Sequence, residues 1–185
     1  MIEDRHVPVF ILNNPLRRLT ESPEKFARTY VSPGMVVADV GCGAGYYTLP
    51  LAKVVGPQGL VFAVDSDEAA VRVLRERAEK EGLKNVKAYV SPAEKLDFIP
   101  SASVDFVLSK DLLCCTVKHK EVVRELARIV KPGGTIYISV RSFPFSKDPR
   151  DVKKSEWREL LSQFEVLRSK QGVTSSWALL RPRSI

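Results

Sequence analysis

The chain has 185 residues, of which 44% are hydrophobic and 28% charged, and its formal net charge is +7. No apolar run is long enough to cross a bilayer, and residues 1–10 include acidic and basic side chains where a signal peptide needs an apolar core. We therefore expect a cytoplasmic globular protein without a membrane partner.

The cysteines and the charge limit the remaining classes of function. Cys114 and Cys115 are adjacent, Cys42 stands alone and no CxxC pair occurs, so the spacing indicates neither a disulfide framework nor a zinc site. The positive charge is compatible with an anionic partner such as RNA or a phosphorylated metabolite. Since the basic residues are spread along the chain and mixed with acidic ones, nucleic acid stays a possible partner on charge alone. No pattern indicates an oligomeric state.

From residue 35 onward, short β-rich runs alternate with helical patterns. Met35–Val40 is a continuous apolar run, typical of a strand buried on both faces of a sheet. A helix is expected from about Gly45 to Val54, with Pro50 tolerated near its first turn. Further strands are expected at 59–65, 85–90, 104–110 and 135–140, and further helices over about 70–81, 117–130 and 155–161.

Glycines are expected to end or turn several of these elements. The sequence KPGG at 131–134 is expected to stop the helix before it. Two β-like runs at 164–170 and 174–182, joined around Gly172, predict a hairpin at the end of the chain.

The alternation of strands and helices predicts an α/β fold with right-handed crossovers, a doubly wound and mostly parallel sheet. In such a sheet ligands bind outside the carboxyl ends of the strands. We predict a single domain over 1–185, with a lead-in segment at 1–33 and a Rossmann-like core at 34–185. The part of the lead-in from Asn13 to Ser32 is expected to pack across the ligand-binding edge.

A glycine-rich turn follows the first strand. Gly41, Gly43 and Gly45 give G-x-G-x-G, whereas a dinucleotide fingerprint needs its third glycine at the position of Tyr46. An aromatic ring there would obstruct the packing of helix on strand that the third glycine permits. The turn therefore disfavours a dinucleotide such as NAD.

Two carboxylates flank this turn. Asp65 ends the second strand, 20 residues beyond Gly45, and a carboxylate can accept two hydrogen bonds from a ribose diol. Asp39 precedes the turn, where its charge would suit a ligand's ammonium group and would be awkward beside a pyrophosphate. This combination favours S-adenosylmethionine. The alternatives are a glycine turn with no ligand, and an Asp65 that only caps the next helix.

Four segments, DVGCGAGYYT, VFAVD, VDFVLSKDLL and RELARIVKPGGTIYIS, resemble successive motifs of the class I S-adenosylmethionine-dependent methyltransferases. The similarity is closest to the small-molecule branch known as type 11 and covers about Met35 to Val140. It implies a seven-stranded sheet with an antiparallel last strand, and S-adenosyl-L-methionine as cofactor. The cofactor-binding residues implied by the resemblance are Asp39, Gly41, Cys42, Gly43, Asp65, Ser66, Ala93 and Ser109.

The resemblance also implies individual roles. Asp39 and the glycines would hold the methionine part, Asp65 the ribose hydroxyls, and Ser66 the adenine edge, while the Ala93 N–H would face the adenine ring. Ser109 and Lys110 would line the floor between cofactor and acceptor, or be ordinary loop residues. Relatives often have an acidic residue before the alanine, where this chain has Pro92, which offers neither carboxylate nor N–H. Glu94 is a candidate substitute.

We expect transfer of a methyl group to a small-molecule acceptor by direct displacement, a reaction in which positioning supplies much of the rate. A general base is needed only for a poor nucleophile, and no catalytic residue is predicted. Lys110, Asp111 and His119 are the polar candidates near the acceptor, although a histidine at a helix start more often faces solvent.

Three alternatives stay open. The basic run FSKDPRDVKKSEWR at 145–158 and the net charge permit an RNA or protein methyltransferase, although no NPPY-type sequence follows the fourth strand. Because an acidic partner for adenine is missing, a second alternative is that the chain is a regulatory subunit that binds the cofactor without catalysing transfer. Cys114 and Cys115 could bind a metalloid, as in arsenite methyltransferases, but in an apolar stretch adjacent cysteines are more often small buried hydrophobes.

Overall fold

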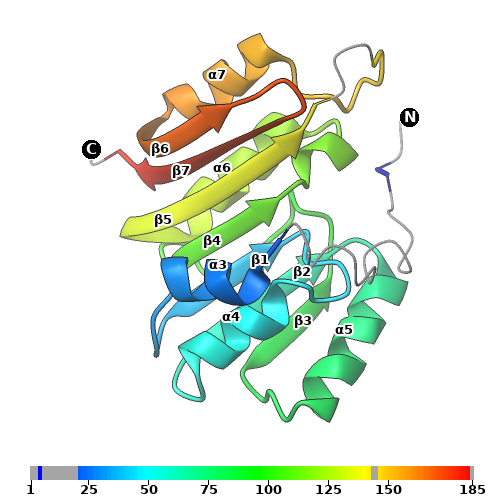
Figure 1. Ribbon diagram of the computed structural model, residues 1–185, viewed down its shortest axis with the longest axis vertical. Coiled ribbons are helices and arrows are strands. Elements are labelled where there is room, and N and C mark those ends of the chain that lie inside the picture. The colour runs from blue at the N-terminus through cyan, green and yellow to red at the C-terminus, as the bar shows by residue number, and fades with distance from the viewer. Residues whose placement is uncertain (1–3, 6–20, 143–145, 184–185) are drawn as a thin grey trace. The chain divides into compact units, whose positions relative to one another are not determined.

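A computed structural model of the chain describes residues 4–5, 21–142 and 146–183 (Figure 1). It contains a seven-stranded sheet with the strand order β3-β2-β1-β4-β5-β7-β6. The described strand pairs are parallel except for those of β7, the last strand in sequence, which runs antiparallel to both of its neighbours. The predicted α/β fold, with a mostly parallel sheet flanked by helices and an antiparallel last strand, is confirmed. Contacts divide the chain into two compact units, one of residues 6–93 and one of residues 1–5 with 94–185.

The N-terminal unit, residues 6–93, holds three parallel strands, β1 (Val36–Val40), β2 (Leu60–Asp65) and β3 (Val86–Val90). Their apolar runs occur where the sequence predicted them. The helices of this unit are α3 (Pro23–Tyr30), α4 (Thr48–Val55) and α5 (Glu68–Lys80). The Asp67 carboxylate caps α5 by accepting hydrogen bonds from the N–H groups of residues 69 and 70. Part of the predicted lead-in, residues 13–20, lies outside the described residues.

Helix α4 begins at Thr48, three residues later than predicted. The reason is the backbone of the preceding turn, because Gly43 and Gly45 have φ angles of 51° and 87°, which no helical residue adopts. Gly45 also allows close packing, since a Cβ at this position would lie 2.4 Å from Cδ1 of the fully buried Leu74. The glycine that permits helix α5 to approach the turn is therefore Gly45, and the position of Tyr46 does not have this role.

The C-terminal unit contains four strands, β4 (Val104–Lys110), β5 (Val130–Arg141), β6 (Phe164–Gln171) and β7 (Ser175–Pro182). Its helices are a single 3₁₀ turn, η1 (Leu113–Cys115), and the α-helices α6 (His119–Ile129) and α7 (Lys154–Ser162). In Figure 1 the hairpin β6–β7 lies beside α7. The predicted hairpin is confirmed, and the N–H of Gly172 donates to the carbonyl of Ser175 at 2.9 Å to close it.

The sequence KPGG follows the end of a helix, as predicted, but it also lies within a strand. Helix α6 ends at Ile129, one residue before the predicted end, and residues 131–134 belong to β5, which begins five residues earlier than the strand predicted at 135–140. The pairing of β4 with β5 shifts register there, from Val104 opposite Val130 to Phe106 opposite Thr135, which is a β-bulge. A Cβ on Gly134 would lie 2.9 Å from the Asp105 carbonyl oxygen, so the bulge needs glycine at this position.

Aromatic packing also characterises the C-terminal unit. Trp157 on α7 is buried, and Trp177 on β7 stacks on Tyr137 of β5, with ring centroids 5.6 Å apart and an interplanar angle of 11°.

Of the helices in the described part of the chain, none is sufficiently long and apolar to cross a membrane.

Candidate functional site

The glycine turn at the carboxyl end of β1 has an open, left-handed backbone. Gly41, Gly43 and Gly45 all have positive φ angles, of 86°, 51° and 87°. The N–H groups of Gly41 and Cys42 both donate to the carbonyl of Val64 on β2, at 2.8 and 3.0 Å. These bonds hold the turn against the end of the neighbouring parallel strand, the edge where ligands of such sheets bind.

Asp65, at the end of β2, contacts this turn directly. One carboxylate oxygen accepts a hydrogen bond from the N–H of Gly43 at 2.7 Å, and the other accepts from the N–H of Asp67 at 2.9 Å. These two bonds fix the orientation of the carboxylate, a group that has about four lone-pair positions for hydrogen-bond donors. The residue is half-buried, and Ser66 beside it is exposed. The alternative, in which Asp65 only caps α5, does not describe this geometry, because Asp67 is the capping residue.

Asp39 lies in β1 with only 3% of its surface exposed. Its carboxylate accepts a 2.6 Å hydrogen bond from the hydroxyl of Thr48, the first residue of α4. Burial raises the pKa of Asp39 to about 7, against the effect of the Thr48 hydrogen bond, and the nearby Asp65 charge raises it further. A buried carboxylate of this kind is stabilised as an anion when a cation binds beside it.

The remaining predicted cofactor-binding residues of the N-terminal unit differ in which of their atoms a ligand could reach. The Cys42 side chain packs in a core cluster with Leu49 and Leu74, so only its backbone could meet a ligand. Ala93 is half-buried and lies in the loop 91–93. At the start of this loop, the N–H of Ser91 donates to the carbonyl of Asp65 at 3.0 Å. This bond places the start of the 91–93 loop at the end of β2.

Sequence reasoning missed several residues that support the turn. Arg77 of α5 donates to the carbonyl of Ala44 at 2.9 Å. The hydroxyls of Tyr46 and Tyr47 donate to Glu21, at 3.3 Å to its carbonyl and at 3.0 Å to its carboxylate. The residue that precedes the N-cap of α3 is therefore bound to the glycine turn. The paired tyrosines were visible in the sequence, but nothing in the pattern identified Glu21 as their acceptor.

In the C-terminal unit, Asp111 binds several side chains at the end of β4. Its carboxylate accepts hydrogen bonds from the hydroxyl of Ser139 at 2.8 Å and from Nε of Arg141 at 3.0 Å, and it pairs with Lys110 at 3.3 Å. Burial alone would raise the pKa of Asp111, but the charge of Lys110 and the bonds from Ser139 and Arg141 outweigh it and lower the pKa. Ser109 is fully buried, and its hydroxyl has no hydrogen-bond partner among the described residues.

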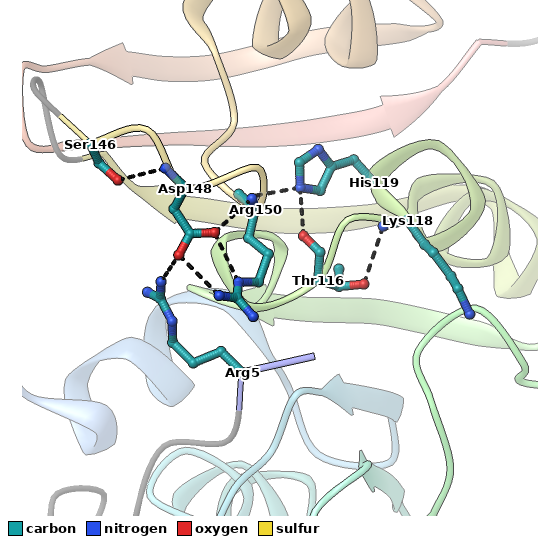
Figure 2. Close-up of polar contacts among 7 residues, drawn as sticks. All are labelled: Arg5, Thr116, Lys118, His119, Ser146, Asp148 and Arg150. Carbon is teal, nitrogen blue, oxygen red and sulfur yellow. Dashed lines mark hydrogen bonds and ion pairs between the residues drawn. The ribbon is translucent and has the colours of Figure 1, made fainter. Parts of the chain in front are cut away.

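His119 is held by the protein on both ring nitrogens. Nδ1 lies 2.8 Å from the Glu156 carboxylate, while Nε2 faces the carbonyls of Thr116 at 2.9 Å and Arg150 at 3.2 Å. Figure 2 shows the imidazole beside the loop in which Arg150 binds Asp148, which also pairs with Arg5. The expectation that His119 faces solvent is wrong, because only 4% of its surface is exposed. Its contacts give it a structural role.

The polar groups near the glycine turn fit the chemistry of one cofactor. S-adenosylmethionine carries an ammonium group, which Asp39 could neutralise, and a ribose diol, which Asp65 could bind. A dinucleotide would instead place phosphates beside two carboxylates. The described residues contain no group of three or more His, Cys, Asp or Glu side chains that could hold a metal ion.

Comparisons with known proteins identify the family of the chain. Residues 31–169 match the family model described as a methyltransferase domain. The chain is 30% identical over 161 residues to a demethylmenaquinone methyltransferase of Geobacillus stearothermophilus, covering 87% of this chain and 68% of that protein. A crystal structure of a SAM-dependent methyltransferase from Aquifex aeolicus is 27% identical, with a TM-score of 0.80 over 95% of this chain and 97% of that one.

A further structure, the PH0226 protein of Pyrococcus horikoshii, shares the fold at 20% identity, with a TM-score of 0.76 over 96% of this chain and all of that one. The predicted cofactor is confirmed by the family and by the Aquifex aeolicus structure. Since the family model spans most of its length, the chain belongs to the methyltransferase domain family and is an S-adenosylmethionine-dependent methyltransferase.

Proposed function

We propose that this methyltransferase transfers its methyl group to a small-molecule acceptor by direct displacement. The observation that supports the acceptor class is the similarity, over 87% of the chain, to an enzyme named for a demethylated menaquinone. A small acceptor also agrees with the C-terminal unit, where Asp148 pairs with Arg5 and Arg150, so part of the basic run at 145–158 is neutralised within the protein.

We further propose that Asp39 and Asp65 carry the main polar contacts to the cofactor. Asp39 would pair with the ammonium group, and this charge would lower its pKa below 7, so a proton leaves Asp39 when the cofactor binds. Asp65 would accept hydrogen bonds from the ribose while Gly43 and Asp67 keep its carboxylate in place. The backbone at Gly41 and Gly43 would approach the methionine part closely, which side chains at these positions would prevent.

When bound, the cofactor supplies a methyl group that is already activated as a sulfonium. The chain then has to align the acceptor and exclude water, and these tasks need no dedicated nucleophile in the protein. Of the polar candidates from the sequence, His119 is committed to Glu156 and two carbonyls, and Asp111 is ionised and paired with Lys110 and Arg141. Neither geometry suits a general base.

The test of the acceptor measures transfer of a labelled methyl group from S-adenosylmethionine. A demethylated naphthoquinol, bulk RNA and a protein extract are offered in parallel, with the Asp65→Asn protein as the control for non-enzymatic methylation. We expect label in the quinol or in another small molecule of a metabolite extract. Label that enters RNA or protein, and no small molecule, would contradict the proposed acceptor class.

A separate measurement tests the proposed binding residues. S-adenosylhomocysteine should raise the melting temperature of the protein, because a ligand bound only by the folded state stabilises it, whereas NAD should not. The Asp39→Asn and Asp65→Asn proteins should lose most of this increase. An unchanged increase in both variants would mean that other residues hold the cofactor.

A further inference from the structure

Two adjacent thiols in the C-terminal unit take no part in the proposed reaction. Cys114 and Cys115 lie in the 3₁₀ turn η1, which follows β4 after Asp111. Asp111 has a φ of 57°, a left-handed conformation that is strained for a residue with a side chain. Its carbonyl oxygen lies within hydrogen-bonding distance of both sulfur atoms, 3.1 Å from Cys114 Sγ and 3.8 Å from Cys115 Sγ. The two sulfur atoms are therefore gathered around one acceptor.

The surroundings of the pair favour the thiolate. A hydrogen bond from the Cys115 thiol lowers the pKa of Cys114 to about 7, against the effect of burial, and the backbone N–H of Arg141 also donates to this sulfur. At neutral pH a large fraction of Cys114 is then ionised, the form that binds metals and electrophiles. The third cysteine is different, because burial and the charges of Asp39 and Asp65 raise the pKa of Cys42 far above its ordinary value.

The number of donors limits what the pair can bind. Zinc takes three or four protein ligands, and the described residues hold no group of three suitable side chains. An internal disulfide is also disfavoured, since adjacent Cα atoms are about 3.8 Å apart whereas disulfides usually join Cα atoms roughly 4.4–6.8 Å apart. Two soft sulfur ligands suit a thiophilic centre that needs only two protein bonds.

We propose that Cys114 and Cys115 form a dithiol site for a thiophilic ligand of the trivalent organoarsenical class, which both sulfur atoms bind together. Cys115 is half-buried and Cys114 has 6% of its surface exposed, so the ligand reaches Cys115 first and Cys114 then closes the chelate. With an arsenoxide, the arsenic–oxygen double bond is replaced by two arsenic–sulfur bonds. The two thiol protons leave with the oxygen as one water molecule, and nothing is oxidised or reduced.

The test is a titration of the full chain with phenylarsine oxide in the absence of a methyl donor, so that binding is measured apart from methyl transfer and from the proposed function. Intact-mass spectrometry and calorimetry should show one arsenical bound per chain with loss of one water. An excess of 2,3-dimercaptopropanol should remove it, whereas the same concentration of a monothiol should not. Cys42 remains in every variant as the internal control for a buried thiol.

The variants Cys114→Ser and Cys115→Ser should each bind the arsenical at least about 100-fold more weakly, because each retains only one bond of the chelate. Both should keep the melting-temperature increase given by S-adenosylhomocysteine, which shows that they are folded. Cys115→Ser should disturb folding less than Cys114→Ser, since the Cys115 side chain is only half-buried. Undiminished binding by either single variant, or by the double variant, would overturn the proposal.

Discussion

Asp39 in the N-terminal unit and Asp111 in the C-terminal unit are both carboxylates at the end of a buried strand, but their surroundings differ. Asp39 is fully buried with one hydroxyl donor, and burial raises its pKa to about 7. Asp111 is paired with two cations and a hydroxyl, which lower its pKa. The charge of Asp111 is compensated within the protein, whereas burial favours the neutral form of Asp39. This difference supports our proposal that the cofactor chemistry lies in the N-terminal unit.

The largest effect on this arrangement should come from Gly45→Ala. The substitution places a Cβ 2.4 Å from Leu74 and forces a side chain into a backbone with a φ of 87°. We expect a loss of about 2–5 kcal/mol in the free energy of unfolding, measured by urea denaturation. Gly34→Ala is the matched control, because Gly34 has a φ of 84° but nothing within 4 Å of its Cβ position. Equal losses in the two variants would refute the packing role of Gly45.

Asp65→Asn tests the second carboxylate of the turn. Replacing the carboxylate removes charge-assisted hydrogen bonds, so affinity for S-adenosylhomocysteine should fall by about 100-fold in calorimetry. Asp67→Asn is the matched control, since Asp67 caps α5 and accepts from residues 69 and 70. It should change the melting temperature while affinity stays within a few-fold. A similar loss of affinity in both variants would point to a general disturbance of the turn.

The substitutions Asp39→Asn and Asp111→Asn should change stability in opposite directions at pH 8 without ligand. The pKa of Asp39 is higher in the folded protein than in the unfolded chain, so its ionisation costs stability as the pH rises towards and past 7. The pKa of Asp111 is lowered, so its charge contributes stability above the unfolded value. We expect a gain and a loss of roughly 1–3 kcal/mol respectively, by thermal denaturation. Stability changes of the same sign would show that the two carboxylates do not differ in charge compensation.

The pH dependence of cofactor binding should give the smallest effect. Below pH 7 a proton competes with the ligand's ammonium group for Asp39, so affinity for S-adenosylhomocysteine should fall by up to about tenfold per pH unit between pH 7 and 5.5. The Asp39→Asn protein should bind more weakly and show a flat profile. A wild-type profile that is flat over the same range would show that Asp39 does not meet the ammonium group.

The elements that the sequence predicted best are those with a strong periodic signal. The strands around Val36–Val40 and Val104–Lys110, and the hairpin after residue 163, agree with their predictions to within a residue or two. The start of α4 was misplaced because positive φ angles in the glycine turn are invisible in a hydrophobicity pattern. The strand β5 was expected to begin only after KPGG, because proline and glycine usually interrupt pairing, and a bulge that tolerates them depends on the partner strand.

The site could be predicted only in part, for a similar reason. Asp39 and Asp65 lie near the carboxyl ends of two parallel strands, so their placement at one edge followed from the parallel order. The partners of His119 and the acceptor of the two tyrosine hydroxyls could not be predicted, because Glu156 and Glu21 are distant in sequence. Such contacts depend on loop conformations that a single sequence does not encode in any repeating pattern.

Both tryptophans of the chain, Trp157 and Trp177, belong to the C-terminal unit, where one is buried and the other stacks on Tyr137. Intrinsic tryptophan fluorescence is therefore an optical reporter of residues 94–185 alone, while far-ultraviolet circular dichroism follows both units. If the chain is the single domain that we propose, the two signals will change at the same denaturant concentration. A fluorescence transition separated from the dichroism transition would instead identify the N-terminal unit as an independently folding domain.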